Sequence, residues 1–258
     1  MGDPAGVGPE ICLDLLNDPE ILDNCHPMIF GDLTILQACA RQTGKVLNTP
    51  VLHLEEITDS PPSGIIDLGI LKPNELNPGI ADARTGRATY EYVVCAIDAC
   101  LADRVEAVVT CPANKEAMQA AGITQPGHTE IFAERTGTKH FCMAFFSETI
   151  SCSLVTVHVG YHEVPSLLSI ERIKQVISLT REAHRNLLGR EPKLAVCGLN
   201  PHASENGLFG RGEEKAIIIP AIERARAEGA DIIGPLPPDT AFTPKRRETV
   251  DAYICMYH

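Results

Sequence analysis

The sequence has no tryptophan and few aromatic residues, which excludes some functions at once. Aromatic side chains make up 5% of its 258 residues. Proteins that hold single-stranded nucleic acid without sequence preference need aromatic side chains on which bases can stack. The formal net charge of -12 also has the wrong sign for non-specific binding to a phosphate backbone. We therefore expect no nucleic-acid partner.

Long apolar runs and paired cysteines are missing too. No stretch is apolar for long enough to span a bilayer, and the first residues do not resemble a signal peptide, so we expect no membrane partner. The 10 cysteines stand singly, mostly within apolar runs, and no Cys-x-x-Cys pair occurs. This pattern is typical of buried, reduced cysteines in a cytoplasmic protein and less typical of a zinc thiolate site.

The chain opens on a loop rich in glycine and proline, MGDPAGVGPE, which runs into a helix-compatible segment. The amide groups of such a junction could face an anion. A tight turn packed closely on a neighbouring segment is an equally good interpretation. Neither a P-loop nor a Gly-x-Gly-x-x-Gly fingerprint is present. A loop of this kind normally follows a strand, and we expect that this first strand is missing here.

Apolar runs alternate with helical patterns in the first half of the chain. This order of elements favours a layered α/β fold, and the 44% hydrophobic content is enough for a core. Strands are predicted at residues 27–30, 51–54 and 105–110, helices at 33–42 and 83–102, and an extended surface loop at 60–78.

The second half begins with a predicted hairpin, two strands separated by the polar residues 147–149. The change to a hairpin, with breaks at Gly122 and Pro126, predicts a first α/β lobe over residues 1–120 and a second lobe over 121–258. The predicted strands are 141–146, 151–159, 194–198 and 250–256, and the predicted helices are 170–188 and 212–227.

Residues 110–130, TCPANKEAMQAAGITQPGHTE, form a candidate anion site. They lead from the end of a predicted strand through Lys115 to His128 and Thr129 at the start of a helix, where a small anion could bind. Thr129 could instead cap that helix, and Lys115 could be a solvated surface residue. The pattern assigns no catalytic residue, although Lys115 and Asp239, in a proline-rich loop, are candidates.

Three histidines stand at or just beyond the ends of predicted strands. His158, His202 and His258 would converge at one edge of an α/β sheet, where such folds bind ligands. Three neutral imidazoles can hold a divalent metal and leave a position open for substrate. Zinc suits nitrogen ligands best, whereas carboxylate or water would complete a magnesium site. With 9 histidines in the chain, their placement at strand ends could also be chance.

Several short segments, taken together and in chain order, resemble one family. They are MGDPAGVGPE, TCPANKEAM, GHTE, VTVHV, LNPHASENGLFG, GPLPPDTAF and the closing MYH. These segments are similar to the 4-hydroxythreonine-4-phosphate dehydrogenases of vitamin B6 biosynthesis, and the resemblance extends from the first residue to the last. It includes the relatives that act on threonate or erythronate phosphate.

The resemblance implies a two-lobed α/β fold like that of the isocitrate and isopropylmalate dehydrogenases. It also implies a homodimer with active sites at the subunit interface. The expected reaction is NAD- or NADP-dependent oxidation and decarboxylation of a phosphorylated hydroxy acid, first of all 4-phosphooxy-L-threonine. D-threonate or D-erythronate 4-phosphate is the alternative substrate. A non-catalytic anion- or metal-binding homologue and an acyl-phosphate transferase are alternatives from other classes.

The resemblance also implies roles for individual residues. His158, His202 and His258 would bind a divalent metal such as zinc, magnesium or cobalt, and His128 and Thr129 would contact the substrate. The family normally has a strand before the opening loop. It also continues after the last histidine with Asp-Gln-Gly and a segment that carries substrate-binding residues. We therefore expect a fold that is incomplete at both ends, and weak or no dehydrogenase activity for this polypeptide alone.

Overall fold

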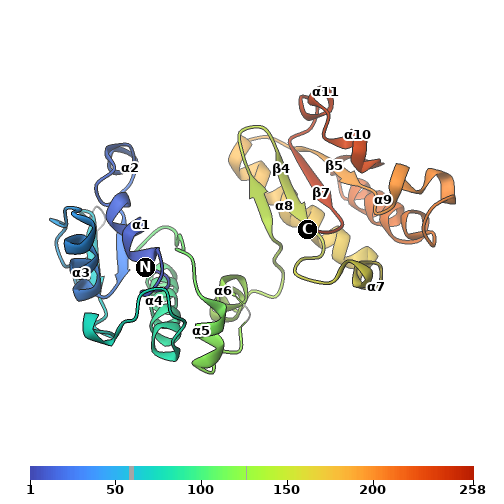
Figure 1. The fold of residues 1–258 in the computed structure, drawn as a ribbon. Coiled ribbons are helices and arrows are strands. Elements are labelled where there is room, and N and C mark those ends of the chain that lie inside the picture. Colours follow the sequence, from blue (N-terminus) through green and yellow to red (C-terminus); the bar gives the residue numbers. More distant parts are fainter. Residues whose placement is uncertain (58–60, 126) are drawn as a thin grey trace. The chain divides into compact units, whose positions relative to one another are not determined.

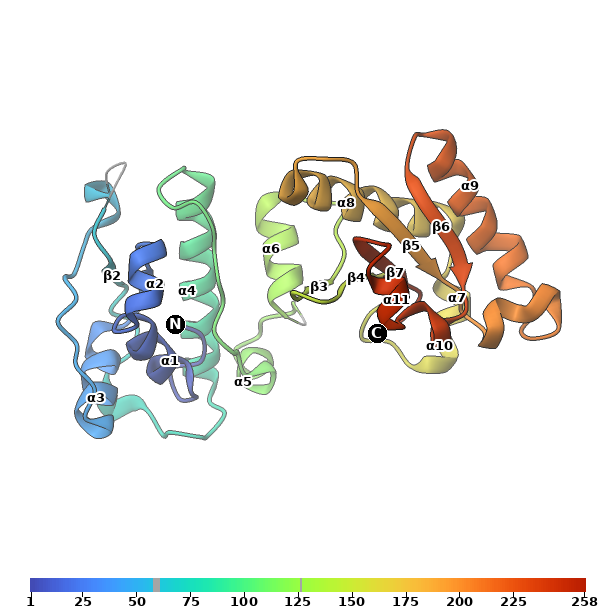
Figure 2. The same cartoon turned by 90° about the horizontal axis from the view of Figure 1, so that it is seen from above.

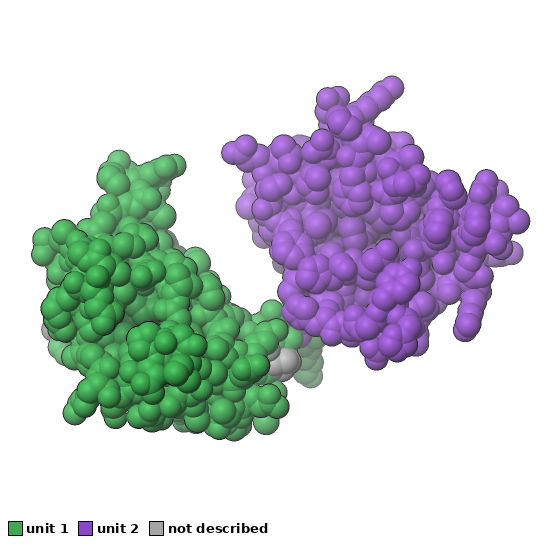
Figure 3. Space-filling model, in the orientation of Figure 1, with its two compact units in different colours: residues 1–139 green, residues 140–258 purple. Residues whose placement is uncertain are grey.

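The computed structural model describes residues 1–57, 61–125 and 127–258, and it divides into two compact units, Met1–Lys139 and His140–His258 (Figures 1 and 3). The sequence placed the boundary earlier, after residue 120, and its expected break at Pro126 lies outside the described residues. The division falls later because α5 (Lys115–Ala120) and α6 (His128–Thr136) both pack on α4 (Ala83–Leu101). Met118 and Ile131 bury their side chains against Val93 and Ile97 there.

The first unit is a mixed α/β unit in which helices surround two short parallel strands. Local sequence explains two of the helix starts. Asp18 accepts a hydrogen bond from the Glu20 amide, and Asp82 accepts one from the Arg84 amide, as N-cap residues do. Besides α4, α5 and α6, the elements are α1 (Gly8–Leu15), α2 (Pro19–Asn24), β1 (Met28–Gly31), α3 (Leu33–Thr43), η1 (Leu54–Glu56), β2 (Gly64–Asp67) and η2 (Pro73–Glu75).

A buried carboxylate holds the elements of the first unit together. Asp32 follows β1 and has no exposed surface. It accepts hydrogen bonds from the amides of Ile70 at 2.8 Å and Leu71 at 2.7 Å, and from the Tyr92 hydroxyl at 2.6 Å. Burial is the main cause that raises the pKa of Tyr92, and its bond to Asp32 acts in the same direction. Asp32 therefore ties α4 to the segment that follows β2.

Two predicted strands of the first unit are wrong. Val51 forms only an isolated bridge to Ile65, and residues 105–110 form no strand. Val109 is 93% exposed. An apolar run becomes a strand only beside a hydrogen-bonded neighbour, and no described residue pairs with this one. Conversely, the described part of the predicted loop 60–78 contains β2, whose Ile65 and Ile66 are buried.

The second unit is built on a sheet of strand order β3-β4-β7-β5-β6. The first pair is the predicted antiparallel hairpin, and the other neighbours are parallel. The strands are β3 (Ala144–Phe146), β4 (Ser151–Leu154), β5 (Lys193–Cys197), β6 (Asp231–Leu236) and β7 (Ala252–Cys255). The helices are η3 (Tyr161–Glu163), α7 (Val164–Leu167), α8 (Ile170–Leu188), η4 (Pro201–Gly207), η5 (Glu214–Ile218), α9 (Ile219–Ala227), α10 (Pro238–Ala241) and α11 (Pro244–Arg247).

Helices cover both faces of this sheet (Figure 2). The predicted amphipathic helix over residues 170–188 is confirmed, and its Ile173 and Ile177 pack with Ile222 of α9 against Leu194 and Ile254. Each fully buried isoleucine contributes about 1.5–3 kcal/mol relative to an exposed one. The alternate strand residues face the opposite way, where Ala195, Cys197 and Tyr253 pack with Ala241 of α10.

The predicted α/β class is confirmed, whereas some details of the second unit differ. β6 was not predicted from the sequence, because its Gly-Pro pair is unusual inside a strand. The run of basic residues after Pro244 forms the short helix α11. Among residues 1–57, 61–125 and 127–258, no helix is long and apolar enough to cross a membrane.

Candidate functional site

Three histidines follow three neighbouring parallel strands of the second unit. β7 lies between β4 and β5, with Leu154 opposite Cys255 and Val196 opposite Ile254. The chain leaves the C-terminal ends of β4, β7 and β5 toward His158, His258 and His202, respectively. The histidines thus belong to the edge of a parallel sheet at which α/β proteins bind ligands.

Two of these histidines lie together. The ring centroids of His158 and His258 are 5.9 Å apart, with the rings edge-on at 65°. Both side chains are exposed, and they line a small cavity of about 120 Å³. The Thr156 hydroxyl donates to the Met256 carbonyl at 2.8 Å and so fixes the two strand extensions to each other.

The third histidine lies on a strained turn after β5. His202 has a φ of 53°, and the next four residues also have positive φ values. Glu214 is 1% exposed and holds the start of this turn. It accepts from the amides of Leu199 at 3.0 Å and Asn200 at 2.8 Å, and from the Asn200 side-chain amide at 3.0 Å. The ring of His202 lies beside Phe209, with ring centroids 6.0 Å apart.

The arrangement fits a metal site in part. No three histidine, cysteine, aspartate or glutamate side chains within the described ranges lie close enough together to hold a metal ion. His202 is therefore not grouped with His158 and His258 here, although it follows the next strand. Exposed, adjacent imidazoles are suitable nitrogen donors for a divalent cation. His158, with a φ of 55°, shares with His202 the left-handed backbone that is uncommon for residues other than glycine and often occurs at functional sites.

The first unit contains the predicted anion site. His128 is the first residue of α6, and its Nε2 is buried without a hydrogen-bond partner. Burial lowers the pKa of His128, and the charge of Lys115 acts in the same direction. Gly127 is the N-cap of α6, so Thr129 lies within the first turn and does not cap the helix. The half-buried Thr129 and the exposed Lys115 complete this group, whereas Asp239 is exposed on α10 of the other unit.

The opening loop packs against the start of the segment 110–130. The Asp3 amide donates to the Pro112 carbonyl at 3.0 Å. Gly2 has a φ of 71°, and a β-carbon there would lie 2.6 Å from the Pro112 oxygen, so only glycine fits. The structure thus brings the two predicted anion-binding segments together and shows the close packing that was the alternative interpretation of the loop.

All ten cysteines are free thiols. Cys12 and Cys111 are close, with Sγ atoms 3.8 Å apart. The Cys12 thiol stabilises the thiolate of Cys111 and lowers the pKa of Cys111 to about 6. This pair could not be predicted from the sequence, because the two residues are far apart in the chain.

Comparison with known proteins identifies relatives over the whole chain. A protein of Oceanobacillus iheyensis, provisionally named a D-threonate 4-phosphate dehydrogenase, is 42% identical over 100% of this chain and 78% of its own length. The 4-hydroxythreonine-4-phosphate dehydrogenase of Desulfosudis oleivorans is 40% identical over 100% of this chain and 77% of its own length.

Solved structures with the same enzyme name are also similar to this chain. The crystal structure of 4-hydroxythreonine-4-phosphate dehydrogenase from Klebsiella pneumoniae matches with a TM-score of 0.89 and 34% identity, over 100% of this chain and 78% of that chain. The model of the PdxA family, described as pyridoxal phosphate biosynthetic protein PdxA, matches residues 23–258. The family indicated by the sequence motifs is confirmed, and this chain belongs to the PdxA family.

Proposed function

We propose that this chain is an NAD- or NADP-linked dehydrogenase that oxidises and decarboxylates a small phosphorylated hydroxy acid. Two relatives are named as dehydrogenases of such phosphorylated compounds, D-threonate 4-phosphate (provisionally) and 4-hydroxythreonine-4-phosphate. The observation that carries the proposal is the placement of His158, His258 and His202 after three adjacent parallel strands. 4-Phosphooxy-L-threonine is the first candidate substrate. D-threonate 4-phosphate is the second, because a relative at 42% identity is provisionally named for it.

We propose that the three histidines hold a divalent cation, either zinc, magnesium or cobalt. His158 and His258 already face one cavity, and His202 would supply the third nitrogen from the turn that Glu214 holds. Neutral imidazoles are required for this role, because a protonated ring has no free nitrogen lone pair. When bound, such a cation acts as a Lewis acid toward the alcohol group of the substrate.

His128 and Thr129 are proposed to hold the anionic end of the substrate. His128 Nε2 is buried and unpartnered, so a ligand that bonds to it replaces no protein contact. The lowered pKa of His128 keeps its ring neutral at pH 7. The amides at the start of α6 and the positive charge of Lys115 favour an anion. Lys115 remains the better candidate for a catalytic role, because it acts electrostatically on His128.

The proposed reaction requires one hydride transfer and the cleavage of one carbon–carbon bond. The nicotinamide cofactor supplies the hydride acceptor. Oxidation of an alcohol next to the carbon that bears the carboxylate gives a β-keto acid. This product loses carbon dioxide, and the electron pair of the broken bond enters an enolate. We propose that this occurs in a two-lobed fold of the isocitrate dehydrogenase type, in a homodimer whose active sites lie at the subunit interface.

The test is an NADH or NADPH formation assay on the full-length gene product with both candidate substrates. We expect turnover with one of them. His158→Ala should lower kcat/KM by at least about 100-fold, since loss even of a supporting residue around a metal typically costs 10–100-fold. His162→Ala is the matched control, because His162 is exposed nearby and does not line the cavity.

Other results would favour other classes. Metal binding without turnover on either substrate would identify a non-catalytic homologue. Coenzyme A-dependent activity that survives His158→Ala would identify an acyl-phosphate transferase. Either result contradicts the proposed dehydrogenase.

A further inference from the structure

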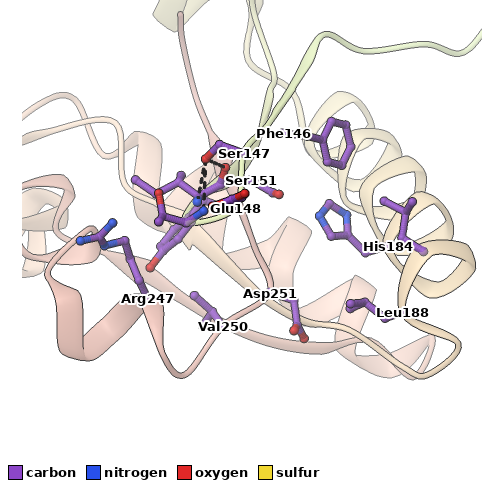
Figure 4. Close-up of a pocket in the computed structure, with 13 residues that line it drawn as sticks. Phe146, Ser147, Glu148, Ser151, His184, Leu188, Arg247, Val250 and Asp251 are labelled. Carbon is purple, nitrogen blue, oxygen red and sulfur yellow. Dashed lines mark hydrogen bonds between the residues drawn. The ribbon is translucent and has the colours of Figure 1, made fainter. Parts of the chain in front are cut away.

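A second, larger cavity lies in the second unit, at the opposite ends of the strands from the histidines. Its volume is about 490 Å³, within the range of small-molecule sites. It is lined by the β3–β4 turn, the last turns of α8, Arg247 of α11 and the start of β7 (Figure 4). Ser151 begins β4 at this cavity, whereas His158 follows the far end of the same strand. At about 3.3 Å per residue, the cavity and the histidines are roughly 20 Å apart along the strands.

Three buried polar atoms around this cavity have no hydrogen-bond partner. They are Nε2 of His184, the hydroxyl of Tyr253 and Nε of Arg247. The His184 residue is 4% exposed and Tyr253 is 2% exposed. Buried polar atoms without partners are rare in folded proteins, because each loses its bonds to water. In Figure 4, Arg247 and His184 lie on opposite sides of the space near Ser147 and Glu148. Three such atoms around one cavity point to a ligand.

The hydrogen-bonding roles of the three atoms define what the ligand must offer. His184 Nδ1 lies 2.9 Å from the Thr180 carbonyl oxygen, which can only accept, so Nδ1 carries a proton. In the neutral ring Nε2 is then an acceptor. The ring also stacks on Phe146, with centroids 5.2 Å apart, and this holds its orientation. Arg247 Nε and the Tyr253 hydroxyl can donate. A complementary ligand therefore has acceptor oxygens and at least one donor.

The charges around the cavity favour an anion. Asp251 lines it, but its carboxylate is paired with Arg190 at 2.6 Å and accepts from the Lys193 amide at 2.7 Å. Glu148 is exposed at the hairpin turn, where water screens its charge. Arg247 forms no ion pair with any residue that the structure describes. Its positive charge is therefore left unpaired beside the cavity.

We propose that this cavity binds a small hydroxylated organic anion. Its carboxylate or phosphate accepts hydrogen bonds from Arg247 and Tyr253, and its hydroxyl donates to His184 Nε2. This site is separate from the histidine site at the opposite ends of the strands, and it does not depend on the proposed dehydrogenase activity.

Isothermal titration calorimetry with two probes tests this proposal. L-Malate represents carboxylates and glycerol 3-phosphate represents phosphate esters. We expect saturable binding of at least one probe. Arg247→Met should weaken it about tenfold or more, because hydrogen bonds to charged groups are the stronger ones. Tyr253→Phe, which keeps the ring, should weaken it severalfold. Arg246→Met is the matched control and should bind like the unaltered chain, because the exposed Arg246 does not line the cavity.

The proposal is wrong if neither probe binds at millimolar concentration, as would be the case if a second copy of the chain covered the cavity. It is also wrong if Arg247→Met and Arg246→Met weaken binding equally. Binding that is lost in His128→Ala and retained in Arg247→Met would place the ligand elsewhere and overturn it as well. Circular dichroism checks that each variant is folded. Should Arg247→Met fail to fold, Tyr253→Phe decides the question.

Discussion

The rings of His158 and His258 lie with their centroids 5.9 Å apart because the strands before them are paired neighbours. β4 and β7 run parallel with Leu154 opposite Cys255, so the two chain segments leave the sheet at the same level. Backbone pairing thus brings together residues that are far apart in the sequence. His202 follows β5, the next strand of the same sheet.

The first prediction concerns metal affinity. Removing one imidazole by His258→Ala or His158→Ala should weaken zinc binding by at least about 100-fold, since even outer-shell changes around a metal cost 10–100-fold. Zinc titration by calorimetry measures this without any need for turnover. His162→Ala is the control and should bind zinc like the unaltered chain. Equal affinities for all three variants would show that these histidines are not ligands.

The second prediction concerns the turn that carries His202. Glu214→Ala removes the buried acceptor of two half-buried backbone amides and one of the two acceptors of the Asn200 side-chain amide. Leaving buried donors unpaired costs about 1–3 kcal/mol each, so we expect a loss of about 3 kcal/mol in the free energy of unfolding. Urea unfolding measures it. Glu205→Ala, at an exposed position of the same turn, should change stability by less than about 0.5 kcal/mol.

Glu214→Gln should lower the free energy of unfolding less than Glu214→Ala does. The amide oxygen still accepts from the two backbone amides, whereas the Asn200 side-chain amide loses this acceptor and the charge is lost. A Glu214→Ala variant as stable as the unaltered chain would contradict the role of this carboxylate.

The sequence predicted those parts of the site that depend on strongly patterned strands. The apolar runs before His158, His202 and His258 become β4, β5 and β7, which is why their strand-end placement could be read in advance. The turn after β5 could not, because its left-handed backbone depends on Glu214, which is separated from His202 in the chain.

Other features could not be predicted from the sequence for a similar reason. The run at residues 105–110 has the composition of a strand, but strand formation depends on a neighbour that sequence pattern cannot identify. The cavity at His184, Arg247 and Tyr253 combines residues from a helix, a short turn of helix and a strand. None of the three belongs to a local motif.

The third prediction concerns stability at high pH. Burial and the bond to Asp32 raise the pKa of Tyr92, so the folded state keeps this hydroxyl protonated above pH 10, where an unfolded tyrosine ionises. A group with a raised folded pKa stabilises the fold fully below its unfolded pKa and loses that contribution as pH rises. Stability should therefore fall above about pH 10.

Tyr92→Phe isolates this contribution. At pH 7 it should cost about 1.5–3 kcal/mol, the range for hydrogen bonds to charged groups. The difference between variant and unaltered chain should shrink above about pH 10, because only the unaltered chain has this tyrosine to ionise. Urea unfolding at a series of pH values measures both. Tyr90→Phe serves as the control, since Tyr90 is only half-buried. A difference that stays constant with pH would contradict the raised pKa.

The last prediction concerns the protonation of His128. Burial lowers its pKa, with the charge of Lys115 acting in the same direction, so the folded state disfavours the imidazolium. An unfolded histidine takes up its proton near pH 6.5, which means that His128 destabilises the fold as pH falls below that value. NMR titration of the ring protons should show a midpoint below about 6.5. Lys115→Met should raise that midpoint toward the ordinary value, whereas Lys139→Met, which removes an exposed lysine at the end of the same unit, should leave it unchanged. An equal shift in both variants would mean that His128 senses only the overall charge, and Lys115 would lose its place beside the proposed anion site.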